Sequence, residues 1–423
     1  MNMLGRPRSL ARLLPVLVAC ALVASCGFRT LKSDLEMIGQ QASLEGTVAG
    51  GGGPIVVVVH GVPGGEVVDL FLLPSPGQFL FTLPAGSYRV GAFEDHNRDL
   101  SHQATEEPAV VFRAPEVVAL RPGERMTGIA LVIDPTRGTT GPLVVDEHAE
   151  PRHVGQLPAL QLGTVVEIDD PRFSHANGKL GLWDPLRFLF DVGAGVYFLE
   201  PYHPDKIPVL FIHGATGHPG DWKYLIERLD RERFQPWLVY YPTAAHLDRV
   251  ATGVGRAVAA LQFQYGITRI AVVAHSMGGL VARAILNHAM TTSDAARLVE
   301  IPAFISISTP WSGHSAAAEG ARHAPVVAPS WEDMAPGSPF LIGLLQTPLP
   351  SECDYTLIFS FAGGSALGGD ANDGSVTLAS QLWLPMQRDA DRVMGFGESH
   401  MGILRSSDVS ALLNTMLAEA LRQ

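Results

Sequence analysis

A short apolar run that ends at a serine constrains the fold of this chain more than any other feature. Residues 269–286 read RIAVVAHSMGGLVARAIL. The unbroken apolar run at 270–274 is typical of a strand buried on both faces, and the later apolar positions recur at helical spacing. The chain must therefore turn sharply from strand to helix at Ser276. The small neighbours Ala274, Gly278 and Gly279 favour a strained turn that exposes the serine hydroxyl.

The pentapeptide AHSMG at 274–278 resembles the nucleophile elbow of the α/β-hydrolase superfamily, in particular of the bacterial lipases and esterases that carry A-H-S-M-G. Ala274 stands where a glycine is usual in this motif. The resemblance implies a mostly parallel, doubly wound sheet with Ser276 as the nucleophile. It also implies an acid and then a base later in the chain. A serine merely exposed between a strand and a helix is the alternative interpretation.

Four histidines follow Ser276 and could supply the base. His288 lies on the predicted helix after the turn, and His314 and His323 lie in a Gly/Ala/Pro-rich segment that no predicted strand precedes. His400, in FGESHMGILRS, follows the last predicted strand and precedes the final helix. Because SHMGIL resembles the base loop of lipase-like enzymes, the resemblance implies His400 as the general base. The alternative is a histidine on a surface loop.

The acid should lie between the serine and the base, at the carboxyl end of a strand. Asp370 and Asp373 follow the predicted strand YTLIFSFAGG, whereas the other aspartates of this region enter or precede strands (Asp354, Asp389, Asp391). NDGSVTLASQ resembles the lipase-like acid motif, in which Asp-Gly is followed by Val and Ser. We therefore predict Asp373 as the acid, and Asp370 remains an alternative.

Two backbone N–H groups are expected to bind the oxyanion that forms during acyl transfer. By the resemblance, one belongs to Met277, next after the serine, and the other to Ala215, in the loop of VLFIHGATGHPGDW. His213 in that loop is interpreted as a packing residue. IVVVVHG at 55–61 has a similar pattern, but it lies within a β-rich region and is interpreted as a strand end.

Residues 311–350 are too long and too apolar for a plain connection and are predicted to form a cap or lid. An apolar cap suits an ester with a hydrophobic acyl group, although apolar side chains that simply pack on the core are an equal alternative. This chemistry needs no metal and no cofactor, and none is predicted.

One segment outside this region has the spacing of a calcium-binding loop. The oxygen-bearing side chains of DHNRDLSHQATE are spaced like calcium ligands, but Leu100 stands where a glycine is needed and no predicted helix flanks the loop. A solvated turn is therefore favoured for this segment (Asp95, Asn97, Asp99, Ser101, Glu106).

The N-terminus resembles a lipoprotein signal. Three arginines precede an apolar stretch at 13–24 that is short for a membrane span, and small residues follow it. LVASCG resembles a bacterial lipobox, which would remove residues 1–25 and lipidate Cys26; Cys20, or an ordinary cleaved signal, is the alternative. Gly27 after the cysteine favours the outer membrane of a bacterial envelope by the same resemblance. Only Cys353 would remain unmodified, so no internal disulfide is expected.

Two sequence patterns divide the rest of the chain. After a polar tether at 26–40, short β runs broken by Gly and Pro at 41–135 predict an antiparallel sandwich. FTLPAGSYRVGAFEDHNRD within it resembles carboxypeptidase-regulatory-like and prealbumin-like modules. Residues 136–160 have linker composition. At 161–423 strands alternate with helices, which predicts an α/β domain. Its first two strands, GTVVEIDDP and GVYFLEP, are expected to pair antiparallel.

The charge balance excludes one class of partner. The 423 residues include 30 basic and 42 acidic ones, a net charge of −12, with no basic stripe, so a nucleic acid partner is not expected. We predict an exported serine hydrolase of carboxylic esters, held at a membrane by its N-terminal lipid. A thioesterase or acyltransferase could use the same residues, and a non-catalytic binding protein of the envelope is the alternative from another class. The sequence identifies no protein partner.

Overall fold

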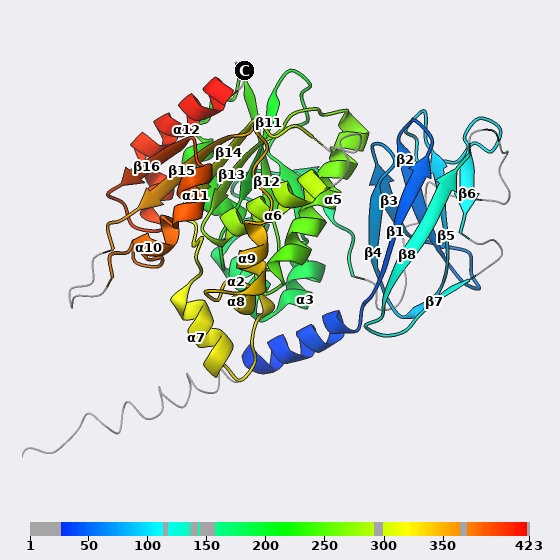
Figure 1. Cartoon of the computed structure of the whole chain (residues 1–423), viewed down its shortest axis with the longest axis horizontal. Helices are drawn as coiled ribbons and strands as arrows, with labels where there is room; N and C mark the ends of the chain where they lie inside the picture. Colours follow the sequence, from blue (N-terminus) through cyan, green and yellow to red (C-terminus); the bar gives the residue numbers. More distant parts are fainter. Residues whose placement is uncertain are drawn as a thin grey trace, which may run out of the picture.

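The computed structural model describes residues 27–112, 117–134, 136, 143, 157–291, 299–363 and 370–420. These residues form a β-sandwich, blue to cyan in Figure 1, and a larger α/β body, green to red. Within these ranges no helix combines the length and the apolar character needed to cross a membrane.

The N-terminal sandwich has two sheets, one in the order β4-β1-β8 and one in the order β3-β2-β5-β6, with β7 paired to β5. Apolar side chains that alternate along the strands fill the space between the sheets. Pairing is antiparallel, as predicted, except that β1 and β8 are parallel. The strands are β1 (Ala42–Gly50), β2 (Ile55–Gly61), β3 (Val67–Leu73), β4 (Gln78–Leu83), β5 (Gly86–Glu94), β6 (Ala109–Val111), β7 (Val118–Leu120) and β8 (Arg125–Ile133).

The α/β body is built on one eight-stranded sheet in the order β16-β15-β14-β13-β11-β12-β10-β9. Each strand of the series β12-β11-β13-β14-β15-β16 is parallel to its neighbours in the sheet, so the carboxyl ends of these strands meet at one edge. The strands are β9 (Gln161–Val165), β10 (Gly195–Phe198), β11 (Ile207–Ile212), β12 (Phe234–Tyr240), β13 (Ala271–His275), β14 (Ala303–Ile307), β15 (Asp354–Ser360) and β16 (Arg392–Phe396).

The expected antiparallel pairing of the first two strands of this sheet is wrong. β9 and β10 are parallel, and β10 is instead antiparallel to β12. The segment between β9 and β10 contains helices rather than a tight turn. A helical crossover returns the chain to the same end of the sheet, and the next strand therefore runs parallel.

Helices cover both faces of the sheet, which confirms the predicted doubly wound, mostly parallel architecture. α5 and α6 lie on one face, and α4 and α12 on the other. The helices are α2 (His175–Trp183), α3 (Pro185–Arg187), α4 (Lys223–Ile226), α5 (Leu247–Tyr265), α6 (Met277–Thr291), α7 (Ser315–His323), α8 (Pro329–Asp333), α9 (Pro339–Leu344), α10 (Leu378–Gln381), α11 (Leu384–Asp389) and α12 (Ser407–Ala420). Short 3₁₀ or π turns are η1 (Pro171–Phe173), η2 (Phe188–Val192), η3 (Pro219–Trp222) and η5 (Gly402–Arg405).

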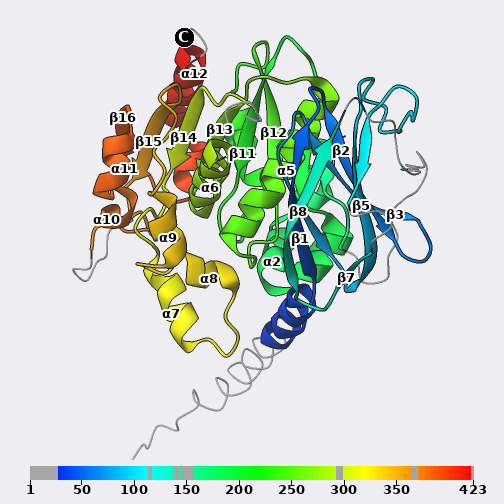
Figure 2. The same cartoon turned by 45° about the vertical axis from the view of Figure 1, so that its right-hand side comes forward.

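The segment predicted as a cap carries three short helices. α7, α8 and α9 lie between β14 and β15 in the chain and form the yellow group beside the sheet in Figure 2. Leu341 and Leu344 of α9 are buried in the core cluster that contains α6. Part of the apolar character of this segment therefore serves packing.

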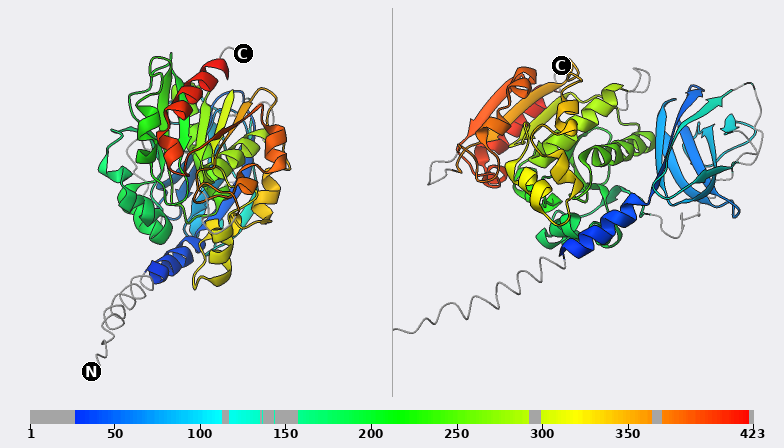
Figure 3. Two further views of the ribbon diagram at one scale, coloured as in Figure 1. Left: turned by 90° about the vertical axis from the view of Figure 1, so that its left-hand side faces the viewer. Right: turned by 60° about the horizontal axis from the view of Figure 1, so that its bottom comes forward.

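The segment predicted as a polar tether is helical instead. Residues 27–39 form a helix that lies beside α2 and the cap, as both views of Figure 3 show. Leu31 is fully buried and Leu35 packs beside it. These side chains are four residues apart and share one helix face, so a single apolar stripe is enough to dock a helix whose other positions are polar.

The sandwich packs against α5 of the α/β body. Phe263 of α5 is buried with Val56, Val58 and Phe93 of the sandwich. Arg256, also on α5, lies 3.3 Å from Asp69 Oδ2. The two bodies are thus joined through a mixed apolar and ionic contact.

Candidate active site

Ser276 occupies a strained turn between β13 and α6. Its φ is +54°, in the left-handed region that L residues other than glycine rarely adopt. Its N–H donates to the Ile307 carbonyl at 2.8 Å, which fixes the turn to the neighbouring strand. A Cβ on Gly278 would lie 2.3 Å from the Ile212 carbonyl oxygen, so only glycine fits there. This is the sharp turn that the sequence predicted, but Ser276 is only 9 % exposed, so the predicted exposure of its hydroxyl is wrong.

His400 and Asp373 lie in line with Ser276. His400 Nε2 is 3.0 Å from Ser276 Oγ, and His400 Nδ1 is 2.7 Å from Asp373 Oδ2. A backbone hydrogen bond joins the same two residues, because the His400 N–H donates to the Asp373 carbonyl at 2.8 Å. The structure thus brings together three residues that are up to 124 positions apart in the chain.

Asp373 is fully buried and has hydrogen-bond donors on both carboxylate oxygens. Oδ1 accepts the backbone N–H groups of Ser375 at 3.0 Å and Val376 at 2.7 Å. Burial alone would raise the pKa of Asp373, but the hydrogen bonds and the charge of the His400 side chain outweigh it and lower the pKa to about 2. Asp373 is therefore a carboxylate at any ordinary pH.

Two further donors to Asp373 were missed by the sequence analysis. Ser360 Oγ donates to Asp373 Oδ2 at 2.7 Å, and Gln381 Nε2 donates to the same oxygen at 3.1 Å. Ser308 Oγ lies 2.6 Å from Ser360 Oγ and extends the network. All three side chains are at most 1 % exposed. A serine at the carboxyl end of β15, just before an acid loop, was the one available signal.

Two buried histidines beside Ser276 remain neutral. Burial lowers the pKa of both His213 and His275 to about 3. Neutral His275 holds the base loop, because its Nε2 lies 2.9 Å from the His400 carbonyl and must donate to it. His213 stacks on Tyr241 at 4.3 Å, which agrees with the packing role proposed for it.

The predicted oxyanion donors lie on the loops that flank Ser276. Ala215 is in the loop after β11, and Met277 is the first residue of α6. In the described residues, the backbone N–H groups of Ala215 and Met277 donate none of the backbone hydrogen bonds of the turns and loops. A Cβ on Gly214 would lie 2.8 Å from Ser276 Cβ, so this loop approaches the serine closely. Tyr241 Oη donates to the His213 carbonyl at 2.6 Å and fixes the loop.

The alternative acid and base residues are placed away from Ser276 Oγ. Asp370 is exposed, and its carbonyl accepts a hydrogen bond from Asn372. His288 pairs with Asp248 at 2.9 Å on α5. His314 lies closer, with Nε2 3.4 Å from Ser375 Oγ at the rim of the acid loop.

The remaining sequence candidates show no ligand site. The Asp95 carboxylate accepts the N–H groups of Asp99 at 3.2 Å and Leu100 at 2.9 Å, so its oxygens are used within the loop itself. Across the described ranges, no cluster of metal-binding side chains occurs. Cys20 and Cys26 lie outside the described residues.

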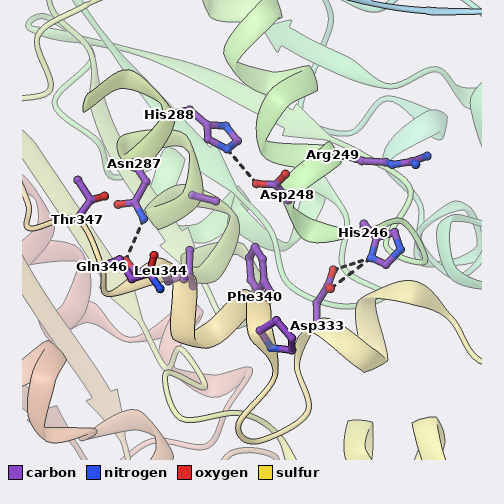
Figure 4. A pocket seen from close by; sticks show the side chains of 13 residues that line it. His246, Asp248, Arg249, Asn287, His288, Asp333, Phe340, Leu344, Gln346 and Thr347 are labelled. Carbon is purple, nitrogen blue, oxygen red and sulfur yellow. Dashed lines mark hydrogen bonds and ion pairs between the residues drawn. The ribbon is translucent and has the colours of Figure 1, made fainter. Parts of the chain in front are cut away.

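A separate cavity of about 510 Å³ lies between α5, α6 and α9 (Figure 4). None of Ser276, Asp373 and His400 lines it. Its polar side chains pair across the walls, as His246 Nδ1 does with Asp333 at 3.3 Å. Asp333 also accepts the Leu247 N–H at 2.7 Å. These bonds join α8, in the segment predicted as a cap, to the start of α5.

Part of the chain matches a known family. Residues 203–331, less than half of the chain, match the family described as "Putative serine esterase (DUF676)". This stretch contains Ser276 and the loop of Ala215, but neither Asp373 nor His400. No curated protein is significantly similar to the chain in sequence.

Several solved structures are similar to about half of the chain. A lin2722 gene product of Listeria innocua is 16 % identical over 50 % of this chain and 94 % of its own, with a TM-score of 0.39. Bacillus licheniformis lipase BlEst2 in its mature form is 16 % identical over 53 % and 97 %, with a TM-score of 0.41. Aspergillus fumigatus lipase B is 16 % identical over 53 % and 56 %, with a TM-score of 0.39.

Proposed function

We propose that this protein is a serine hydrolase that cleaves carboxylic esters through an acyl-enzyme intermediate. The observation that carries the proposal is the hydrogen-bonded line from Ser276 Oγ through the His400 ring to Asp373. A serine hydroxyl is a weak nucleophile until an adjacent base removes its proton. The partial match to a serine esterase family, which spans Ser276, supports the same reaction.

In the proposed reaction, the contacts support a separate role for each residue in the first half. His400 Nε2 accepts the Ser276 hydroxyl proton as Oγ forms a bond to the ester carbonyl carbon. The carboxylate of Asp373 accepts the Nδ1–H, fixes the tautomer and stabilises the imidazolium. The ester carbonyl oxygen gains the negative charge, and the N–H groups of Met277 and Ala215 are proposed to stabilise it, each contributing about 3–4 kcal/mol.

The second half releases both products. The imidazolium gives its proton to the leaving alkoxide as the ester C–O bond breaks, which leaves an acyl group on Ser276. A water molecule then gives a proton to His400, attacks the acyl carbon and releases the acid, and the proton returns to Ser276 Oγ. Water and ester are thus converted to acid and alcohol with no other reactant.

The proposed substrate has a hydrophobic acyl group, and the proposed site of action is a bacterial envelope. The apolar cap supports the first point. The N-terminal sequence supports lipidation at Cys26, with the outer membrane favoured over the inner one. A Cys26→Ser variant that still fractionates with membranes would contradict this anchor.

Labelling with a fluorophosphonate probe tests the reaction class. The wild-type protein should label and Ser276→Ala should not, and hydrolysis of p-nitrophenyl butyrate should fall about 10⁵-fold or more in the variant. Equal labelling of both proteins would overturn the proposal. Rates along a series of p-nitrophenyl esters test the acyl preference: activity on acetate that vanishes above butyrate would contradict a hydrophobic acyl group.

A further inference from the structure

The helix of residues 27–39 is fixed to the α/β body by three kinds of contact. Leu31 is fully buried with Leu182 and Ala328. The Phe28 ring meets the Trp183 ring edge-on at 5.3 Å. The buried Asp34 accepts the Leu186 N–H at 3.0 Å. Gly27, the first described residue of the chain, is therefore held at a fixed point of the molecule.

That point lies beside an apolar loop of the cap. Residues 324–329, between α7 and α8, read APVVAP. Pro325 is exposed and Val327 is half-buried, whereas Val326 packs with the cluster that contains Leu31. Figure 1 and both views of Figure 3 show the blue helix and the yellow α7 at the same end of the molecule.

The same end carries the candidate active site. α7 begins directly after His314, whose ring reaches Ser375 beside the acid loop. α7 has nine residues, so it spans about 13 Å. The apolar loop at its far end is thus separated from the acid loop by one short helix.

The sequence before the helix indicates which kind of surface this end of the molecule contacts. Cys26, the residue proposed for lipidation, stands directly before the first residue of the helix, so its acyl chains would hold this end of the helix at a lipid surface. An anchor on a flexible tether would let the protein tumble, but an anchor that enters a docked helix also sets its orientation.

We propose that the end formed by the helix of residues 27–39 and the loop 324–329 rests on a lipid bilayer, so that the site around Ser276 faces the membrane and takes its ester from it. This proposal rests on the proposed ester-hydrolase function and names its substrate class, a lipid ester of the bilayer that holds the enzyme.

A fluorescence measurement tests the orientation independently of activity. An environment-sensitive fluorophore is attached to Val327→Cys or, as a control, to Glu300→Cys at the opposite edge of the sheet, both in full-chain Ser276→Ala. Cys353 does not compete for the label, because it is buried and burial raises the pKa of its thiol to about 12. In vesicles of phosphatidylethanolamine and phosphatidylglycerol, the label at 327 should shift to the blue and the label at 300 should not. Equal, water-like spectra at both positions would overturn the proposal.

A kinetic measurement tests the consequence for the substrate. A Gly/Ser segment of about 20 residues is inserted between Gly27 and Phe28, which frees the anchor over about 25 Å and keeps the docked helix. The same insertion between Glu150 and Pro151 is the control. Vesicles contain a fluorogenic diacylglycerol ester, and p-nitrophenyl butyrate in solution reports basal activity.

The insertion at residue 27 should lower hydrolysis of the vesicle ester about tenfold and leave the soluble ester within about twofold, because only the anchoring geometry changes. The control insertion should change neither rate. Unchanged vesicle hydrolysis after the first insertion would overturn the membrane orientation. Failure of the wild type to hydrolyse even the soluble ester would instead overturn the proposed function, and the fluorescence result would still decide the orientation.

Discussion

At the residue scale, the carboxylate of Asp373 is the group on which most contacts of the site converge. Asp373→Asn should keep the packing but present an amide to His400 Nδ1, which favours the wrong imidazole tautomer. We expect kcat for p-nitrophenyl butyrate to fall about 10⁴-fold. Asp370→Asn is the matched control, because Asp370 is exposed and makes no contact with His400. Equal losses in the two variants would show that the acid has been misassigned.

The donors behind Asp373 lead to a second prediction at this scale. Ser360→Ala removes the hydroxyl that donates to Asp373 Oδ2 at 2.7 Å, and a hydrogen bond to a buried charge is worth about 1.5–3 kcal/mol. The free energy of unfolding in urea should fall by about that amount at neutral pH. The Asp373 pKa is depressed to about 2, so its ionised form stabilises the fold above the unfolded pKa and this contribution is lost as the pH falls through about 2. The loss in Ser360→Ala should therefore shrink in acid.

Ser351→Ala, an exposed serine before β15, is the control for Ser360→Ala. It should leave stability unchanged at every pH. If Ser360→Ala destabilised the protein equally at neutral and acidic pH, the hydroxyl would act through packing and not through the charge of Asp373.

A site residue could be predicted from the sequence only where its immediate neighbours in the chain form a recognisable motif. Ser276, Asp373 and His400 each lie in a short motif set by its own turn, so their neighbours in the chain identify them. Ser360 and Gln381 have no such motif. They meet Asp373 because β15 and α10 fold against the acid loop. The only local signal for this contact is the position of Ser360 at the carboxyl end of a strand, and Gln381 has none.

At the element scale, the titratable pair of His246 and Asp333 joins the predicted cap to α5. The hydrogen bond that His246 Nδ1 donates to the Asp333 carboxylate raises the pKa of His246 against the effect of partial burial. The charges of Asp333 and Glu332 raise it further, and the charge of Arg249 lowers it. Because the pKa of His246 is higher in the folded than in the unfolded protein, the pair stabilises the cap fully below the unfolded pKa of about 6.5. This stabilisation is lost as the pH rises through the pKa of His246 in the folded protein. Hydrogen exchange of residues 315–345, corrected for its intrinsic pH dependence, should therefore accelerate as the pH rises above about 6.5.

His246→Asn tests this pair, because its amide can still donate to Asp333 but does not titrate. The pH-dependent part of the exchange should vanish in this variant, and the Leu247 N–H bond to Asp333 should keep the cap closed. Identical pH dependence in the wild type and the variant would exclude the His246–Asp333 pair as its cause.

The elements that sequence patterns missed depend on long-range packing. The strand–helix alternation after residue 161 predicted the sheet, since each element repeats the same local period. The direction of β9 depends on a crossover whose helices were not recognised. The helix of residues 27–39 has a stripe of only a few apolar residues, and it becomes stable because α2 and the cap bury Leu31.

At the scale of the whole molecule, the contact between the sandwich and α5 should make the two bodies unfold together. Arg256 lies 3.3 Å from Asp69 Oδ2 and its guanidinium lies 4.8 Å from the centre of the Phe71 ring. Burial raises the pKa of Asp69, and Arg256 opposes the rise. Arg256→Ala leaves that carboxylate without its cation, and we expect a loss of about 1–3 kcal/mol and a split into two unfolding transitions.

Arg256→Met separates charge from packing, because it keeps an apolar stem over Phe71 without the charge. If the ion pair matters, Arg256→Met should lose stability in the presence of Asp69 and regain most of it when combined with Asp69→Asn, which removes the need for a cation. A double-mutant cycle on calorimetric stabilities measures this coupling, expected at about 1 kcal/mol. Additive losses would mean that the apolar contact around Phe263 alone joins the bodies, and the sandwich would then unfold with α5 even in Arg256→Ala.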